Sequence, residues 1–157
     1  MKKLIYGFKN AFVGIIFCIK TCRNFRIHMV FAAYVLYFSR FYELDTATFA
    51  VLILTISLVL TLEALNCALE QVCNALTTKY NIMIKHAKDA AAGAVLIAAI
   101  FAAVIGVCVF YDPPTVIGIY NYFILVPIRA AVLIITLALS IIFIFYKDIF
   151  KSGKQRD

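Results

Sequence analysis

The sequence predicts an all-α protein that crosses a membrane several times. The chain has 157 residues, 65% of them are hydrophobic, and its mean hydropathy is +0.99. A soluble domain of this length is nearer half apolar. Stretches without charged residues, long enough to cross the hydrocarbon core of a bilayer, mark the expected transmembrane helices. The length leaves room for one compact membrane domain and no separate soluble one.

The first expected element, residues 1–20, is an amphipathic helix that lies in the membrane interface. Its apolar residues fall at helical spacing, whereas Lys9 and Asn10 lie away from this stripe. The uninterrupted apolar run 11–19 has nine residues, too few to span a bilayer. A signal peptide is the alternative, but Lys9 and Asn10 interrupt its apolar region and no small-x-small cleavage site follows.

Four transmembrane helices are expected to follow. The first, 25–42, is short because charged residues trim both its ends. The second covers 47–62, and the same helix continues to residue 75. The third, 90–111, has 22 residues without charge, enough to cross about 30 Å of hydrocarbon at ~1.5 Å per residue. The fourth covers 130–146 and completes an even number of spans.

The basic residues are distributed unevenly between the two sides of the expected membrane. Thirteen of the fifteen lysines and arginines lie in the first 28 residues, in the loop 77–89 or in the tail, which leaves Arg40 and Arg129 for the other side. The positive-inside rule therefore predicts that both termini and this loop are cytoplasmic, in a multi-pass protein of the cell membrane. Orientation and anionic lipid account for the net charge of +7 without nucleic acid as a partner.

The cysteines and histidines do not form a recognisable site. The five cysteines are odd in number and scattered along apolar segments, so we interpret them as small apolar residues of the helices. No CxxC or Cys/His cluster indicates zinc. We interpret His28 and His86 as interfacial polar residues, and Gly93 as a position of close helix packing.

A polar stripe at the end of the second expected span is the strongest candidate for a functional site. At ~100° per residue, four residues fall within about 80° of arc on one helical face: Glu63, Asn66, Glu70 and Asn74. One interpretation is a seam of hydrogen bonds to neighbouring helices. Ionisable groups near lipid are costly, and two nearby carboxylates must be separated, protonated or bridged. These costs favour a site for a hard divalent cation with oxygen ligands.

Lys88 and Asp89 stand at the cytoplasmic start of the third expected span, where helix N–H groups favour anions. By itself Lys88 is equally explained as an interface anchor. Beside the carboxylate stripe, however, a cation at a helix N-terminus indicates a phosphate site. Carboxylates, Mg²⁺ and a phosphate-binding lysine at a membrane surface together indicate phosphoryl transfer to something in the lipid.

The run EALNCALEQVCN, followed by KYNIMIKHAKDAAAGAVL, resembles the small prokaryotic integral-membrane diacylglycerol kinase family. The family's pattern is E-x-x-N-x-A-x-E-x-x-x-D and then, about 13 residues later, A-K-D. The segments FKNAFVG (8–14) and RNFRIH (23–28) match as well, and the resemblance covers about residues 3–111. AKDAAAGAV is closer to the undecaprenol kinase branch than to the diacylglycerol kinases proper.

The resemblance implies an ATP- and Mg²⁺-dependent lipid kinase that forms homotrimers with active sites shared between protomers. Glu63 would be the general base for the lipid hydroxyl, and Glu70 would hold the magnesium that carries ATP. Asn66, Lys88 and Asp89 would complete the ATP site with Glu70, Lys88 at the phosphates. Undecaprenol is the lipid alcohol that the branch implies, with diacylglycerol as the alternative. The family lacks a P-loop, and this chain has no GxxxxGK[ST].

Two positions depart from the family's pattern. Cys22 stands where the family usually has a glutamate that serves as a second metal ligand, and a thiolate is a poor ligand for Mg²⁺. Asn74 replaces the aspartate that ends the E-x-x-x-D element. Both changes remove negative charge, so metal affinity should fall. A catalytically impaired membrane binding or scaffold protein is therefore an alternative, and a small transporter, which needs no phosphate site, is a third.

The resemblance also divides the chain. We expect residues 1–112 to form the kinase-like membrane domain, with the interfacial helix and three transmembrane helices. Residues 113–157 would add a fourth transmembrane helix and a basic cytoplasmic tail. No role for this fourth helix follows from the sequence.

Overall fold

The computed structural model describes residues 2–77 and 79–153, with side chains for 3–77 and 79–146. Its elements are α1 (Lys2–Thr21), α2 (Arg23–Phe38), the 3₁₀ helix η1 (Ser39–Phe41), α3 (Thr46–Leu76), α4 (Ile82–Phe110), α5 (Pro113–Ile124) and α6 (Pro127–Gly153). No strand occurs in these ranges, so the predicted all-α class is confirmed. Residues 154–157 of the expected basic tail lie outside the described part of the chain.

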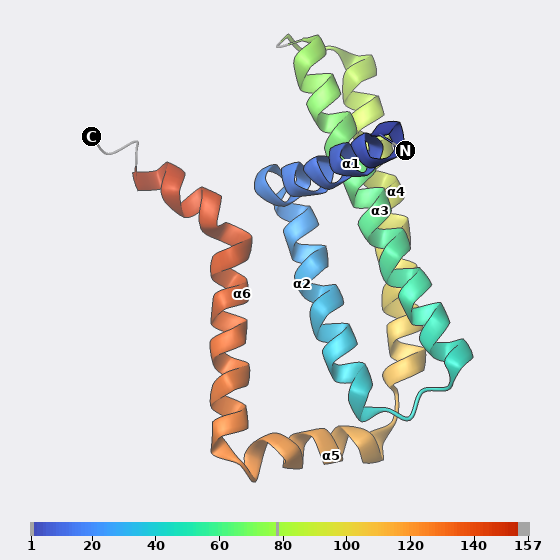
Figure 1. Cartoon of the computed structure of the whole chain (residues 1–157), viewed down its shortest axis with the longest axis vertical. Helices are drawn as coiled ribbons and strands as arrows, with labels where there is room; N and C mark the ends of the chain where they lie inside the picture. The colour runs from blue at the N-terminus through green and yellow to red at the C-terminus, as the bar shows by residue number, and fades with distance from the viewer. Residues whose placement is uncertain (1, 78, 154–157) are drawn as a thin grey trace.

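The long helices α3 and α4 lie side by side and form the main packed pair of the molecule (Figure 1). Each begins at a residue whose side chain accepts hydrogen bonds from the first turn. The Asp45 carboxylate accepts the N–H of Thr48 at 2.6 Å, and the Asn81 side chain accepts the N–H groups of Met83 and Ile84 at 2.9 and 3.3 Å. These caps account for the helix starts.

Among the described residues, four helices are long and apolar enough to cross a membrane: Lys3–Thr21, Thr46–Leu76, Ile82–Phe110 and Pro127–Tyr146. Large apolar side chains such as Leu54, Phe101 and Ile134 point outward from the last three, with exposed fractions of 64–68%. Lipid-facing surfaces have this character, because lipid tails solvate apolar side chains as well as the protein interior does. The protein is a multi-pass helical membrane protein.

The helices α1 and α2 correspond to two elements expected from the sequence, the interfacial helix and the short first span. Although α1 meets the length and hydropathy criteria for a span, it lies crosswise to the other helices at one end of the molecule, as an interfacial helix does (Figure 1). The 16 residues of α2 run alongside α3 and α6. They cover about 24 Å at ~1.5 Å per residue, and η1 adds about 6 Å more. The expected short first span therefore corresponds to α2 and η1.

The helix α5 was not predicted from the sequence. It lies crosswise at the opposite end of the molecule from α1 (Figure 1). It begins with two prolines at its first helical positions, where no hydrogen bond is lost. Its far end carries Tyr122 and Phe123, whose rings pack against Phe41 of η1 with centroids 5.1 and 6.4 Å away. The helix thereby links the C-terminal end of α2 to the start of α6.

Arg26 of α2 ties three helices together and is only 1% exposed. Its Nε and Nη2 donate to the carbonyl oxygen of Ile144 in α6 at 3.0 and 2.8 Å, and Nη1 donates to the carbonyl of Ile19 in α1 at 3.0 Å. A buried cation is tolerated when its donors are satisfied in this way. These hydrogen bonds between helices were not predicted from the sequence, where Arg26 was counted among the basic residues near the membrane surface.

Gly93 does not have the close packing that the sequence analysis expected of it. A Cβ built on Gly93 meets no atom within 4 Å, so no neighbouring helix of this chain approaches its backbone. The buried residues of α4 are Val95 and Ala98 instead. The expectation was wrong within a single chain. Small residues in a membrane helix favour close approach of another helix, but the sequence does not show at which of them this contact forms.

Candidate active site at the ends of helices α3 and α4

Glu63 is a buried carboxylic acid in the middle of α3, with an exposed fraction of 2%. The residues around it on the helix, Leu60, Ala64 and Cys67, pack against a buried cluster from the α1–α2 junction. That cluster comprises Cys18, Cys22 and Phe25. A carboxyl group in apolar surroundings is costly, so its presence here indicates a function rather than a structural need.

The polar stripe leaves the packed interior as it follows α3 toward its end. Asn66 is half-buried, whereas Glu70, one turn farther along the helix, is exposed. Asn74, one turn farther, is exposed. All four stripe residues belong to the single continuous helix Thr46–Leu76, so the predicted common face is confirmed. The stripe runs about 16 Å from Glu63 to Asn74 at ~1.5 Å per residue.

The far end of the stripe opens on a polar cavity between α3, the connecting loop and α4. Its volume is about 570 Å³, and three lysines line it together with Asn74 and Asp89: Lys79, Lys85 and Lys88. The Lys88 Nζ donates to the Asn74 Oδ1 at 2.6 Å. Because the partner is a neutral amide, the hydrogen bond positions the ammonium without cancelling its charge. The structure thus joins the two separate motifs of the sequence, which lie 14 residues apart.

The expectation that Lys88 and Asp89 stand at a helix N-terminus is wrong. The helix α4 begins at Ile82, nearly two turns earlier, and the N–H groups of Met83 and Ile84 are already occupied by the Asn81 cap. The charged residues between Ile82 and Asp89 do not stop a helix that emerges from lipid into water. Any anion in the cavity would therefore be bound by the lysine side chains and not by free helix N–H groups.

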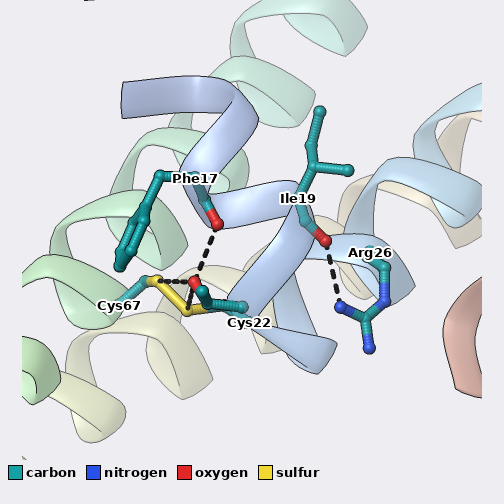
Figure 2. Close-up of a disulfide and its surroundings, with 6 residues drawn as sticks. Phe17, Ile19, Cys22, Arg26 and Cys67 are labelled. Atoms are coloured by element: carbon teal, nitrogen blue, oxygen red, sulfur yellow. Dashed lines mark hydrogen bonds between the residues drawn. A yellow bond between two sulfur atoms is a disulfide. The ribbon is translucent and has the colours of Figure 1, made fainter. Parts of the chain in front are cut away.

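Cys22 and Cys67 form a disulfide, with their Cα atoms 6.2 Å apart (Figure 2). The Thr21 hydroxyl donates to the carbonyl of Phe17 at 2.7 Å and lies 3.5 Å from the Cys22 sulfur and 3.9 Å from the Cys67 sulfur. The interpretation of all cysteines as small apolar residues is therefore wrong for this pair.

Metal ligands do not gather in one place within the described chain. In residues 3–77 and 79–146, no three side chains of His, Cys, Asp or Glu converge in a way that could hold a metal ion. Glu70 and Asn66 offer oxygen donors one turn apart on α3. This donor set fits Mg²⁺, which binds proteins through one or two carboxylates and takes its remaining ligands from water and phosphates.

A second cavity lies among α2, α3 and α4 and has a volume of about 440 Å³. Its walls are apolar apart from His28 and Thr55, and they include Val59 and Leu60, one turn before Glu63 on α3. Glu63 itself does not line this cavity.

The family model described as prokaryotic diacylglycerol kinase matches residues 9–110. The chain belongs to the prokaryotic diacylglycerol kinase family. Members of this family are lipid kinases, so the resemblance drawn from the sequence is confirmed. The match ends at Phe110, the last residue of α4, and α5 and α6 lie beyond it.

Two relatives within the family carry different names. The diacylglycerol kinase of Synechocystis sp. is 41% identical over 111 residues, which cover 70% of this chain and 63% of that protein. The undecaprenol kinase of Bacillus subtilis is 34% identical over 110 residues, which cover 70% of this chain and 89% of that protein. The two names agree on a lipid alcohol as the class of acceptor for these relatives and differ on which one.

Proposed function

We propose that this protein transfers the γ-phosphate of ATP to the hydroxyl group of a membrane lipid alcohol. Undecaprenol is the proposed acceptor, and diacylglycerol is the alternative. The observation that carries the proposal is a buried carboxyl, Glu63, on the same helical face as a lysine-lined polar cavity. A site of this kind offers an acid–base group at lipid depth and a phosphate-binding group in water.

Glu63 is proposed as the general base of the transfer. The apolar chain of the acceptor would lie in the cavity among α2, α3 and α4, with its hydroxyl directed toward the part that Val59 and Leu60 line, one turn before Glu63. The carboxylate would accept the hydroxyl proton as the oxygen attacks the γ-phosphate. Positioning of the two reactants and electrostatic stabilisation supply most of the catalysis in phosphoryl transfer.

ATP is proposed to occupy the polar cavity, with Lys88 at its phosphates and Asp89 beside it. The Asn74 amide would hold the Lys88 ammonium in place, as its hydrogen bond of 2.6 Å does in the unliganded protein. Glu70 and Asn66 would hold Mg²⁺ between this cavity and Glu63. When bound, the ion neutralises charge on the phosphates.

Three further features belong to the proposal. Both termini and the 77–89 loop face the cytoplasm, where ATP is present, as the basic residues indicate. Residues 1–112 form the kinase-like domain, to which 113–157 add α5, α6 and a basic tail. The protein forms a homotrimer with shared sites. This last feature is what the resemblance to the family implies.

The test uses purified protein in lipid vesicles with labelled ATP, Mg²⁺ and either undecaprenol or diacylglycerol. We expect label to enter the lipid, and the Glu63→Gln variant to lose about 10²–10⁴-fold in rate, the contribution typical of a general base. Glu43→Gln, which changes an exposed carboxylate at the opposite end of the molecule, serves as the matched control. The proposal is abandoned if neither alcohol is phosphorylated.

A membrane binding or scaffold protein without catalytic activity is the second candidate. The observation that favours it is Cys22, which stands where the family pattern has a metal-binding glutamate and is bonded to Cys67. The same vesicles separate the two functions under reducing conditions. Binding of ATP without transfer to either lipid supports the second candidate.

A further inference from the structure

Cys22 is the hinge between the interfacial helix and the first span. It is the single residue between α1 and α2, and its backbone is extended, with φ −106° and ψ 109°. Its own N–H bonds to the carbonyl of Cys18 at 2.9 Å, while the N–H of Arg26 reaches the Cys22 carbonyl at only 3.4 Å. A rotation of α1 relative to α2 would therefore occur at Cys22.

The disulfide joins this hinge to the helix that carries Glu63. Cys67 lies one turn after Glu63 on the same face of α3, and the exposed fraction of its side chain is 1%. The bond closes the junction over Leu60, Ala64 and Cys67, the residues that surround Glu63. In this closed form Glu63 is 2% exposed, so a lipid hydroxyl has no direct access to its carboxyl.

Access to Glu63 therefore requires the α1–α2 junction to move away from α3. A general base must come within about 3 Å of the hydroxyl from which it takes a proton. With the cysteines reduced, no covalent bond holds the junction on α3, and thermal opening can admit the acceptor. With the disulfide formed, a covalent bond at the hinge prevents this opening.

We propose that Cys22 and Cys67 are a reversible thiol–disulfide pair whose oxidation holds the α1–α2 junction closed over Glu63 and stops phosphoryl transfer. This inference rests on the proposed function and on the cytoplasmic orientation of the site. Thiols facing the cytoplasm are kept reduced, so a disulfide there forms only when the redox state changes. The pair would reduce kinase activity under oxidising conditions.

The oxidant is a low-molecular-weight disulfide. The thiolate of Cys22 attacks one sulfur of that molecule, forming a mixed disulfide and releasing one small thiol. The thiolate of Cys67 then attacks the Cys22 sulfur, which forms the Cys22–Cys67 bond and releases the second small thiol. The two cysteines lose two electrons and two protons in all, and the two small thiols carry them away. A reducing thiol reverses both steps.

The experiment treats the full chain in vesicles with reduced glutathione or glutathione disulfide and measures three properties. Peptide mass spectrometry detects the Cys22–Cys67 bond. A membrane-permeant carbodiimide labels accessible carboxyl groups, with exposed Glu70 as the internal reference for Glu63. The lipid kinase assay measures the rate. Two variants without the bond, Cys67→Ala and Cys67→Ser, are compared with Cys108→Ala, which removes an exposed thiol near the far end of α4.

We expect oxidation to form the bond, to protect Glu63 but not Glu70 from the carbodiimide, and to lower the rate by about tenfold or more, a change that glutathione reverses. Both Cys67 variants should remain active and labelled in glutathione disulfide, while Cys108→Ala should behave like the parent protein. The inference is overturned if no Cys22–Cys67 bond forms, or if Glu63 is labelled equally in both redox states. It is also overturned if the bonded and reduced proteins turn over equally fast. Redox-dependent protection of Glu63 without lipid phosphorylation in either state would uphold the closure and reject the proposed kinase function.

Discussion

At the scale of single residues, the helical spacing of Glu63, Asn66 and Glu70 was sufficient to predict their common face, because a face follows from the helical period alone. Spacing did not show that Glu63 is buried and Glu70 exposed. That difference arises from the α1–α2 junction, which covers only one part of α3. This difference in burial agrees with the two roles proposed for them, Glu63 toward a lipid hydroxyl and Glu70 toward a nucleotide in water.

Lys88 is the residue on which the proposed nucleotide site depends. We expect Lys88→Met to raise the KM for ATP by about tenfold or more, because a charge-assisted hydrogen bond to a phosphate is worth about 1.5–3 kcal/mol. The KM for the lipid acceptor should not change, since Lys88 lies in the polar cavity and not among the apolar walls of the other cavity. Steady-state kinetics with each substrate varied in turn measures both constants.

Lys9→Met is the control for that substitution, because Lys9 is an exposed lysine on α1. It should leave both constants near those of the parent protein. An unchanged KM for ATP in Lys88→Met would exclude Lys88 from the phosphates. A change confined to the lipid KM would show that the cavity binds the acceptor instead.

At the scale of single elements, the apolar stretches predicted where helices cross lipid, but not where they end. Charges mark the limits of a span, whereas a helix continues into water until a cap stops it, and α4 accordingly begins at Ile82. The short helix α5 was not predicted because its 12 residues are too few to cross a membrane and therefore did not mark a span. The signals that could have located it are Asp112 and the two prolines that follow, an N-cap residue and favoured first helical positions.

Asp45 at the start of α3 makes stability depend on pH in a defined direction. Hydrogen bonds from the side chain and then the backbone N–H of Thr48 lower the pKa of Asp45 below its ordinary value. The folded state therefore favours the charged carboxylate. Its contribution is fully present above the ordinary pKa of an aspartate, about 3.9, and is lost as the pH falls through the lowered value.

Substitutions at Asp45 test this dependence through the melting temperature. We expect Asp45→Ala to lower the melting temperature by a few degrees at pH 7 and by less at pH 3, because part of the carboxylate's contribution is lost as the pH falls. Asp45→Asn keeps an acceptor at both pH values, so it should lose less stability between pH 7 and pH 3 than the parent protein. Glu43→Gln, two residues away, is the control. Equal pH dependence in Asp45→Asn and the parent protein would contradict the role of the carboxylate.

At the scale of the whole molecule, Arg26 decides where α6 lies. Its guanidinium joins the carbonyl of Ile144 in α6 to that of Ile19 in α1, and its carbon Cζ lies 5.2 Å from the centre of the Tyr146 ring. A second link is the hydrogen bond of 3.2 Å between the hydroxyls of Tyr34 and Ser140. The helix beyond the family match is thus attached to α2 of the shared core, next to the hinge at Cys22.

We expect Arg26→Met to lower the melting temperature in a fixed detergent by several degrees, because it removes charge-assisted hydrogen bonds worth about 1.5–3 kcal/mol each in a buried position. Arg26→Lys should fall between Met and the parent protein, since a lysine cannot reproduce the planar fork of donors. Loss of helical circular dichroism on heating measures the effect. Arg40→Met, which changes an exposed arginine, is the control, and equal melting of all four proteins would mean that Arg26 does not hold α6.

The sequence by itself determined the all-helical membrane class, the interfacial first helix, the polar stripe on α3 and the family. Hydropathy, charge asymmetry and helical period are properties of neighbouring residues, so they can be evaluated along the chain without knowing how the helices pack. Only the tertiary structure decided which residues meet across helices. Pairings between distant positions depend on the angle and register at which helices pack, and a local period carries no information about either. The decisive pairings are those of Lys88 with Asn74, Arg26 with Ile144, and Cys22 with Cys67.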